Sequence, residues 1–273
     1  MHLLLGSAAK VQLETEVKKH IDKITEKNEQ VRISLFRIGD RDDDVQYEKS
    51  ILRACAKNGI TVESNVYGTE IAEDELYKAI LSAATRKEID GILIFRPLPK
   101  ALRTEKILFA VPPEKDIDGM LLEKSAFLPC TPEGCMHLLN AYGIHPKGKK
   151  CVVVGRSPVV GKPLAELLIK AGADVTVCHT QTENVPAETR KAEILFAACG
   201  KPEMIDRNYL STGQIVVDVG FHEKEGRFCG DVVKEDAMEL AEAYTPVPGG
   251  VGAVTLSVLM LHSVQAHERN YSL

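Results

Sequence analysis

Hydrophobic positions along the chain follow two alternating periods. Apolar residues recur at helical spacing between residues 8 and 28, and residues 31–38 then alternate as a strand does. The pattern repeats, which predicts helices at 45–58 and 73–86 and strands at 60–67 and 89–95. Because alternating strands and helices are typical of a parallel sheet with helices on both faces, this part of the chain is predicted to form an α/β domain.

A proline-rich stretch separates this series from a second one. Arg96-Pro97-Leu98-Pro99 ends the strand at 89–95, and prolines recur as far as Pro132. Beyond them a helix is predicted up to about residue 142, and a second series begins with a strand at 149–154. Its remaining elements are predicted as strands at 175–178, 194–197 and 215–218 and a helix at 255–267. Two sheets of this kind predict two domains, with the last helix packed back on the first.

Composition and charge narrow the classes of function. The 273 residues are 44% hydrophobic, which is enough to build the core of one large or two medium domains. The formal net charge of -5 gives no general attraction for polyanions, so neither nucleic acid nor a membrane surface is an expected partner. No apolar run approaches the roughly 20 residues of a membrane span. The first residues lack a basic leader, so a cytoplasmic location is expected.

The cysteines argue against two kinds of site. They form an odd set without a CxxC pair, at positions 55, 130, 135, 151, 178, 199 and 229. This pattern suits neither a disulfide framework nor a structural zinc site, so no metal is expected. Most of these side chains are predicted to be buried, reduced thiols.

A glycine turn after the strand at 149–154 is typical of a dinucleotide site. Gly155 and Gly161 stand between this strand and a segment of helical periodicity, where glycine allows close approach of a pyrophosphate and the helix start offers N–H donors. Five residues separate the two glycines, and Ser157 stands where the GxGxxG pattern has its middle glycine. An ordinary strand-to-helix turn therefore stays open as the alternative for this pattern alone.

The tip of the next predicted strand bears on the choice of nucleotide. The strand at 175–178 runs into His179-Thr180-Gln181-Thr182, without the acid that binds the ribose 2′-hydroxyl in NAD-preferring sites. Arg156 is available to pair with a 2′-phosphate. NADP is therefore the expected cofactor and NAD the alternative. We interpret His179 as a structural residue or a cofactor contact rather than a general base.

Several short segments, spread over most of the chain, carry a resemblance to one known family. The segments are Asp90-Gly91-Ile92-Leu93, Pro97-Leu98-Pro99, Lys115-Asp116-Ile117-Asp118-Gly119, Phe127-Leu128-Pro129-Cys130-Thr131-Pro132, Gly155-Arg156-Ser157, Val160-Gly161-Lys162-Pro163, Cys178-His179, Asp218-Val219-Gly220 and Thr245-Pro246-Val247-Pro248-Gly249-Gly250-Val251-Gly252. In these letters and in this order they resemble the methylenetetrahydrofolate dehydrogenase/cyclohydrolase family. An ordered set of this length is far more specific than any one of its motifs.

The resemblance implies two α/β domains on either side of a cleft. Residues 1–128, joined by a C-terminal helix at 253–273, would form a folate-binding α/β domain. Residues 129–252 would form a Rossmann-type NAD(P)-binding domain. The resemblance also implies a homodimer, a tetrahydrofolate derivative as substrate and a nicotinamide cofactor.

Individual positions are assigned by the same resemblance. Tyr47 and Asp118 are implied as catalytic and substrate-binding residues, because an aromatic ring suits the pterin face and a carboxylate suits its amino edge. Surface packing of Tyr47, and capping of the turn at Gly119 by Asp118, are the alternatives. The other implied folate contacts are Pro97, Leu98, Pro248, Gly249, Gly250, Val251 and Gly252. The implied NAD(P) contacts are Gly155, Arg156, Ser157, Val160, Gly161, His179, Thr180, Gly200 and Gly220.

Two positions depart from the family pattern. The family has a lysine four residues after the tyrosine and a glutamine just before a Leu-Pro-Leu-Pro stretch, whereas this chain has Ile51 and Phe95 there. Neither side chain can position water or transfer a proton, so the cyclohydrolase site is predicted to be lost. Lys49, Arg53 and Arg96 are the candidate substitutes. The first two are predicted off the helix face of Tyr47, and Arg96 on the strand face opposite Phe95.

Loss of hydrolysis leaves the redox step intact for a chemical reason. Lone pairs on two nitrogens stabilise the cation that forms when hydride leaves the methylene carbon, so orientation against the nicotinamide does most of the work. We therefore expect an NADP-dependent 5,10-methylenetetrahydrofolate dehydrogenase without cyclohydrolase activity. The alternatives are a bifunctional enzyme with a substituted cation, a non-catalytic nucleotide-binding regulatory module, and another Rossmann-type dehydrogenase acting on amino acids or shikimate.

Overall fold

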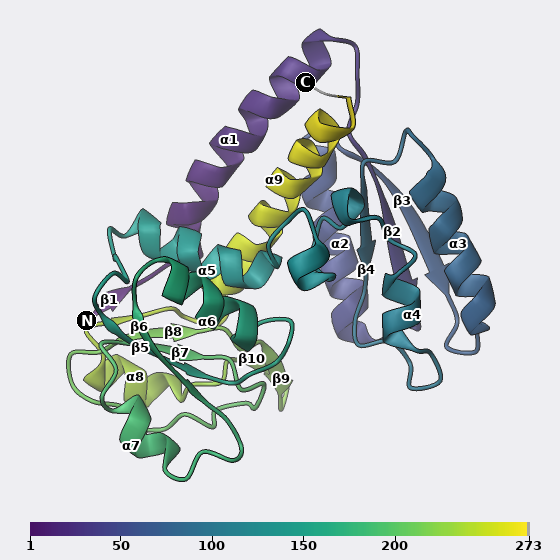
Figure 1. Cartoon of the computed structure of the whole chain (residues 1–273). Helices are drawn as coiled ribbons and strands as arrows, with labels where there is room; N and C mark the ends of the chain where they lie inside the picture. The colour runs from purple at the N-terminus through teal and green to yellow at the C-terminus, as the bar shows by residue number, and fades with distance from the viewer. Residues whose placement is uncertain (272–273) are drawn as a thin grey trace. The chain divides into compact units, whose positions relative to one another are not determined.

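The computed structural model describes residues 1–271, which divide into two compact units (Figure 1). Unit 1 comprises Met1–Gln12 and Pro129–Val258, and unit 2 comprises Leu13–Leu128 and the chain from Leu259 onward. Helices α1 (Gly6–Glu26) and α9 (Val251–Tyr271) each contribute residues to both units. Among the described residues, no helix has the length and apolar character that crossing a membrane requires.

Unit 2 is built on a three-stranded parallel sheet with the order β3-β2-β4. The strands are β2 (Arg32–Ile38), β3 (Thr61–Tyr67) and β4 (Gly91–Ile94). Helices α2 (Asp42–Lys57) and α3 (Glu73–Thr85) lie beside this sheet in Figure 1, and α4 (Thr104–Leu108) and 3-10 turns at Pro113–Lys115 and Leu122–Lys124 follow β4. Leu76 and Ile80 of α3 share one buried apolar cluster with Phe36 and Ile94 of the sheet, so packing of α3 holds β4 in place.

Helix α2 is the element that carries Tyr47. Three acidic residues, Asp42, Asp43 and Asp44, occupy its first turn, where negative charge complements the helix dipole. Its buried positions are Asp44, Glu48, Ile51 and Cys55. This spacing of three and four residues defines one helix face, so Ile51 lies on the buried face of α2 together with two carboxylates that are paired with arginines.

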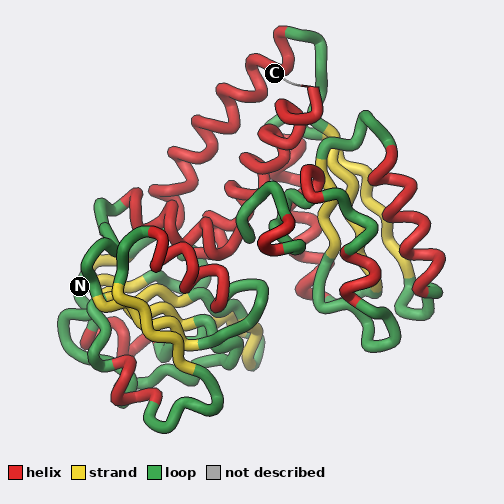
Figure 2. The backbone as a smooth tube through the Cα atoms, viewed as in Figure 1, coloured by secondary structure: helices red, strands yellow, loops and turns green. Residues whose placement is uncertain are grey.

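Unit 1 is built on a six-stranded parallel sheet with the order β1-β11-β8-β7-β5-β6, visible as the larger group of strands in Figure 2. The strands are β1 (His2–Leu3), β5 (Lys150–Val154), β6 (Asp174–Cys178), β7 (Ile194–Ala197), β8 (Ile215–Asp218) and β11 (Ala243–Tyr244). An antiparallel hairpin of β9 (His222–Lys224) and β10 (Arg227–Cys229) follows β8. The helices are α5 (Cys130–Ala141), α6 (Gly161–Lys170), α7 (Val185–Thr189) and α8 (Lys234–Leu240).

The order of strands in unit 1 reverses direction at β5. Strand β5 pairs with β6 on one side and with β7 on the other, so the loops after β5 and β7 leave the sheet side by side. In open α/β sheets, ligands bind outside the carboxyl ends of the strands at such a switch point. The candidate nucleotide turn at Gly155 follows β5 directly.

The structure differs from the predicted elements where segments are very short. The predicted domain of residues 1–128 differs from unit 2 at its start, because β1 pairs with β11 and so joins residues 1–12 to unit 1. Strands β1 and β11 have two residues each, which is too short to show a period. The predicted C-terminal helix at 253–273 corresponds to α9, and residues 272–273 of that range lie outside the described residues.

The end of α9 is fixed in unit 2 by a buried histidine. His267 Nδ1 lies 3.0 Å from Asp90 Oδ2, and its Nε2 lies 3.3 Å from Glu29 Oε2. Asp90 also accepts hydrogen bonds from the Arg32 N–H and from the Asn270 amide. Burial lowers the pKa of His267, but hydrogen bonds and charge from Asp90 and Glu29 outweigh it, so the net pKa is raised.

We expect His267→Gln to flatten the pH dependence of stability. A histidine whose folded pKa is raised adds stability that is complete below its unfolded pKa, about 6.5, and that is lost as pH rises through the folded pKa. Urea titrations followed by circular dichroism suit a chain without tryptophan. Between about pH 6 and pH 9 the free energy of unfolding should fall more for the wild type than for the variant. The exposed His145, changed to Gln, should keep the wild-type slope; equal slopes in all three proteins would contradict this role.

Candidate active site

Tyr47 packs against one of the two residues that depart from the family pattern. Its ring centroid lies 5.6 Å from that of Phe95, and the ring planes meet at 78°, an edge-to-face arrangement. Phe95 is buried, and Tyr47 is half-buried. The buried phenyl ring therefore supports the half-buried tyrosine ring.

The second departing residue, Ile51, lies one helical turn beyond Tyr47. Its side chain is fully buried, with 0% exposure. Lys49 and Arg53 are exposed, and Arg53 Nε donates to the Lys49 carbonyl at 3.1 Å. Ile51 and Phe95 therefore offer only apolar groups at these two positions, while the buried Glu48 on the same helix face is bound to Arg37 and Ser64, and Lys49 and Arg53 lie on the solvent side.

Arg96 lies at the predicted folate site, against expectation. The sequence predicted a strand at 89–95 and so an Arg96 side chain that points away from the site. Strand β4 ends at Ile94, however, so strand alternation no longer determines the direction of Arg96. Its Nη2 lies 3.3 Å from Asp118 Oδ2, with 18% and 23% of the two side chains exposed. The structure thus brings together a predicted pterin carboxylate and a cation that sequence reasoning had placed elsewhere.

The turn beside Asp118 is capped by a neighbouring carboxylate. Asp116 is fully buried and accepts the N–H groups of Met120 at 2.9 Å and Leu121 at 2.7 Å. Burial raises the pKa of Asp116, although these hydrogen bonds oppose the rise. Because Asp116 binds the N–H groups of this turn, the capping role considered for Asp118 is supplied from another position, which favours a ligand-facing role for Asp118.

The glycines of the nucleotide turn are required by their surroundings. Gly155 has φ +125°, and a Cβ there would lie 2.0 Å from the Ala198 carbonyl oxygen. A Cβ on Gly161 would lie 2.2 Å from the Gly155 carbonyl oxygen. Ser157 Oγ accepts from Val160 N at 3.1 Å and Gly161 N at 3.3 Å. Ser157 therefore caps the start of α6, a role that a middle glycine could not fill.

Arg156 and His179 make different hydrogen bonds in the loop that follows β6. Arg156 is exposed, and its Nη2 donates to Gln181 Oε1 at 3.3 Å. The backbone N–H of His179 donates to Thr182 Oγ1, while His179 Nδ1 accepts from Gln181 N at 3.2 Å. These bonds favour a structural role for His179 and place the guanidinium beside the acid-free loop at 179–182. Thr180 lies within the same loop.

Two buried carboxylates, which sequence reasoning missed, hold the loops after β7 and β8. Asp231 accepts from Gly200 N and Lys201 N, both at 2.9 Å, and its Oδ1 lies 2.7 Å from His222 Nε2. Asp218 accepts from Gly220 N at 3.1 Å and from Asp231 N at 2.9 Å. Burial raises the pKa of Asp218 to about 7. The implied nucleotide positions Gly200 and Gly220 are therefore fixed through Asp231 and Asp218.

The loop at Pro248–Gly252 is anchored to the start of α1 within unit 1. Gly249 has φ +107°, and its carbonyl accepts from Gly6 N at 2.8 Å. A Cβ on Gly6 would lie 2.2 Å from the Gly250 carbonyl oxygen, so this approach requires glycine. Helix α9 begins at Val251, directly after the loop. Of the five implied folate-contacting residues, Pro248, Gly249 and Gly250 thus belong to the fixed turn, and Val251 and Gly252 to the first turn of α9.

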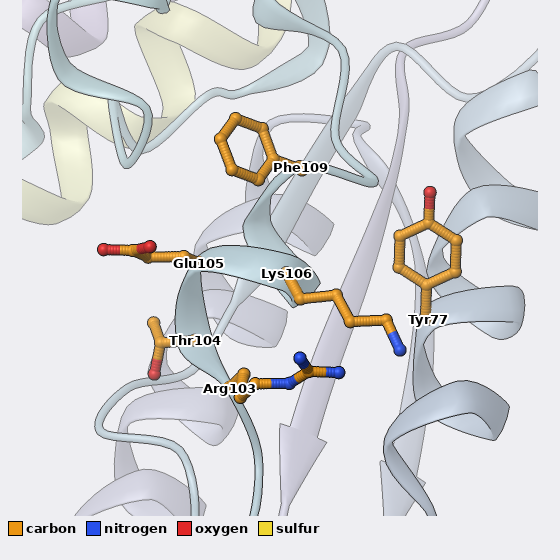
Figure 3. Close-up of a pocket in the computed structure, with 6 residues that line it drawn as sticks. All are labelled: Tyr77, Arg103, Thr104, Glu105, Lys106 and Phe109. Atoms are coloured by element: carbon orange, nitrogen blue, oxygen red, sulfur yellow. The ribbon is translucent and has the colours of Figure 1, made fainter.

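A separate hollow in unit 2 contains none of the implied site residues (Figure 3). Its cations are already paired: Arg103 Nη2 lies 2.6 Å from Glu73 Oε1, and Lys106 Nζ lies 2.5 Å from Asp74 Oδ1. Hydrogen bonds from Arg103, and one from Lys106, lower the pKa of Glu73, and the bond from Lys106 to Asp74 lowers the pKa of Asp74. The hollow is lined by Tyr77, Arg103, Thr104, Glu105, Lys106 and Phe109.

The other groups to consider in the described residues are the cysteine thiols and possible metal ligands. All seven cysteines are free thiols, and all except Cys199 are buried. Burial raises the pKa of Cys55 to about 12, so this thiol on α2 stays protonated near neutral pH. Within residues 1–271 no three His, Cys, Asp or Glu side chains are grouped to hold a metal ion.

We expect Asp231→Asn to weaken nucleotide binding. One amide oxygen cannot accept every hydrogen bond that the carboxylate now receives, and an unsatisfied buried donor costs about 1–3 kcal/mol. The Kd for NADPH, measured by fluorescence titration, should therefore rise about tenfold or more. Asp236→Asn is the matched control, because Asp236 likewise binds a backbone N–H, that of Arg207 at 2.9 Å. Equal Kd values for both variants would show that Asp231 does not position the nucleotide loop.

Comparison with known proteins identifies the family. The family model for the catalytic domain of tetrahydrofolate dehydrogenase/cyclohydrolase matches residues 4–118, and the model for its NAD(P)-binding domain matches residues 129–271. The bifunctional protein FolD of Clostridium botulinum (strain Langeland) is 39% identical over 278 residues, covering 98% of this chain and 99% of the relative.

Solved structures agree with these matches. The bifunctional FolD enzyme from Campylobacter jejuni has a TM-score of 0.92 at 34% identity, covering 98% of this chain and 99% of that chain. FolD from Trypanosoma brucei, complexed with NADP cofactor and inhibitor, has a TM-score of 0.91 at 27% identity, covering 99% and 98%. The predicted α/β fold with catalytic and Rossmann-like NAD(P)-binding domains is confirmed, and the chain belongs to the tetrahydrofolate dehydrogenase/cyclohydrolase family of oxidoreductases.

Proposed function

We propose that this protein oxidises 5,10-methylenetetrahydrofolate to 5,10-methenyltetrahydrofolate by hydride transfer to NADP, and that it does not accelerate hydrolysis of the product. The observation that carries the proposal is a contrast within unit 2. Tyr47 and Asp118 are retained, while Ile51 and Phe95 are both buried and apolar, and Phe95 packs against Tyr47. The FolD relatives are named as bifunctional, so the proposal departs from them at these two positions.

The retained residues suit substrate binding for hydride transfer. Asp118 can accept hydrogen bonds from the amino edge of the pterin, and the ring of Tyr47, supported by Phe95, can lie along its face. When bound, NADP supplies the acceptor for hydride. Because two nitrogen lone pairs stabilise the resulting cation, the side chains need only orient the methylene carbon, and no protein base has to remove a proton.

Hydrolysis of the methenyl product requires groups that hydride transfer does not require. Attack of water on the methenyl carbon requires a group that positions the water and handles its proton. Ile51 is 0% exposed and Phe95 is 6% exposed, and neither has a donor or acceptor. Among the three substitute cations, Lys49 and Arg53 are exposed, and Arg96 is bound to Asp118. A bifunctional enzyme that uses Arg96 is therefore the second candidate.

The preference for NADP over NAD rests on unit 1. The loop after β6 has no carboxylate at its tip, and Arg156 reaches this loop through Gln181. A guanidinium in this place can bind a 2′-phosphate, and no acid repels it. The helix start at Gly161 and the required glycines suit the pyrophosphate. By family resemblance we also infer a cytoplasmic homodimer, with folate binding at 1–128 and nucleotide binding at 129–252.

We expect Arg156→Ala to raise the KM for NADP about tenfold or more, because a charge-assisted hydrogen bond contributes about 1.5–3 kcal/mol. The KM for NAD should change little, since NAD has no 2′-phosphate. Initial rates with saturating methylenetetrahydrofolate measure both constants. Lys170→Ala removes the same charge from the far end of α6 and should change neither. A wild-type enzyme with higher kcat/KM for NAD than for NADP would overturn the preference itself.

We expect the purified enzyme to form methenyltetrahydrofolate and to leave its decay at the rate seen in buffer, because loss of a positioned acid or base removes about 10²–10⁴-fold of rate. Absorbance follows formation and decay in one cuvette. Ile51→Lys with Phe95→Gln should restore some hydrolysis. Thermal unfolding should be measured for this variant, because the new polar groups replace buried side chains and could destabilise the fold. If the wild type speeds the decay, the proposed loss is wrong, and Arg96→Leu would then show whether Arg96 is the cation.

A further inference from the structure

The backbone from which the Arg96 side chain extends toward Asp118 is fixed by hydrogen bonds. The Phe95 N–H donates to the Phe36 carbonyl at 2.9 Å, which ties this point of the chain to β2. Arg41 Nη2 donates to the Arg96 carbonyl at 3.4 Å, and Arg41 is itself bound to Asp44 by two hydrogen bonds of 2.8 and 2.9 Å. Arg96 therefore leaves β4 from a fixed position, and its approach to Asp118 is built into the unit.

Most of the donors of this guanidinium face no protein acceptor within the described part of the chain. The side chain is 18% exposed. Within the described residues, its guanidinium donates one hydrogen bond, from Nη2 to Asp118 Oδ2 at 3.3 Å. A guanidinium carries five N–H donors, and those of Arg96 that have no protein acceptor are open to solvent, because every buried side-chain nitrogen of the described residues has a hydrogen-bond partner. A ligand acceptor placed beside Asp118 would satisfy the donors that remain.

Building on the proposed function, we propose that Arg96 is a substrate-binding residue that reads the 4-oxo group of the pterin. The pterin edge presents an amino group, a ring N–H and a carbonyl oxygen in a row, two donors followed by an acceptor. A carboxylate alone satisfies the donors and leaves the carbonyl oxygen facing negative charge. Asp118 with Arg96 offers acceptors followed by donors, which complements the whole edge.

This role is particular to this chain. The family stretch Leu-Pro-Leu-Pro reads Arg96-Pro97-Leu98-Pro99 here, so the guanidinium stands where the family has an apolar side chain. The 4-oxo group lies next to N5, which carries the methylene carbon, but it keeps its bonds and its role as a hydrogen-bond acceptor throughout hydride transfer. Arg96 should therefore stabilise the ground state and the transition state equally, which lowers the KM for folate and leaves kcat unchanged.

The test compares the wild type with Arg96→Leu and Arg96→Lys, using the exposed Lys100→Leu as a control for loss of charge. In Arg96→Leu the KM for methylenetetrahydrofolate should rise about tenfold or more, with kcat within about twofold and the KM for NADP unchanged. Arg96→Lys should fall between the two, because an ammonium gives a point charge without the planar fork. Lys100→Leu should match the wild type.

A binding measurement separates recognition from mere support of the fold. The probes, titrated calorimetrically, are tetrahydrofolate and its 4-amino-4-deoxy analogue, in which an amino donor replaces the carbonyl oxygen and ring N3 loses its hydrogen. The wild type should prefer the 4-oxo compound by about tenfold or more, and Arg96→Leu should reduce this preference to the part that Asp118 provides through the ring N–H. If Arg96→Leu does not fold, reduced discrimination by Arg96→Lys carries the test.

Unchanged KM and unchanged discrimination in the Arg96 variants of an active enzyme would overturn the inference. A fall in kcat at constant KM would overturn it as well, because it would place Arg96 in the chemical step. A wild type that neither oxidises methylenetetrahydrofolate nor binds tetrahydrofolate would instead refute the proposed function, so the two failures are distinguishable.

Discussion

Parallel pairing of strands is the constraint on which both units depend. In a parallel sheet all strands end at the same edge, so the loops that follow them gather there. In unit 1 the turns at Gly155, Gly200 and Gly220 follow β5, β7 and β8, and in unit 2 Arg96 follows β4. Backbone hydrogen bonding therefore assembles residues that are far apart in the sequence, and buried carboxylates such as Asp231 then hold the loops in position.

The long elements could be predicted from the sequence because each repeats its apolar period several times. Helix α3 places Leu76, Ile80 and Ala83 on one buried face, and β7 was predicted with its observed bounds, Ile194–Ala197. Strands β1 and β11 could not be predicted, because two residues define no period and only their pairing makes them strands. The direction of Arg96 was missed because it depends on β4 ending one residue early, a feature of tertiary hydrogen bonding.

The sequence indicated which residues belong to the candidate site, but it did not indicate which residues contact one another there. Tyr47 and Asp118 follow from the resemblance, but the packing of Tyr47 on Phe95 and the ion pair of Asp118 with Arg96 join separate segments. No local pattern marks Asp231 as the residue that binds the Gly200 loop, because its partners lie about thirty residues away along the chain. Contacts of this kind are set by the fold, and sequence spacing does not contain them.

Because β1 pairs with β11, unit 1 is built from two segments that are separated along the chain. Unit 1 takes its first strand from the start of the chain, and residues 13–128 are inserted before its remaining strands. A fragment cut to begin at Pro129 would leave β11 as an open edge with unpaired backbone groups, which invites association with other chains. The smallest continuous segment that can complete the larger sheet therefore runs from β1 to β11, and it includes the whole inserted segment 13–128.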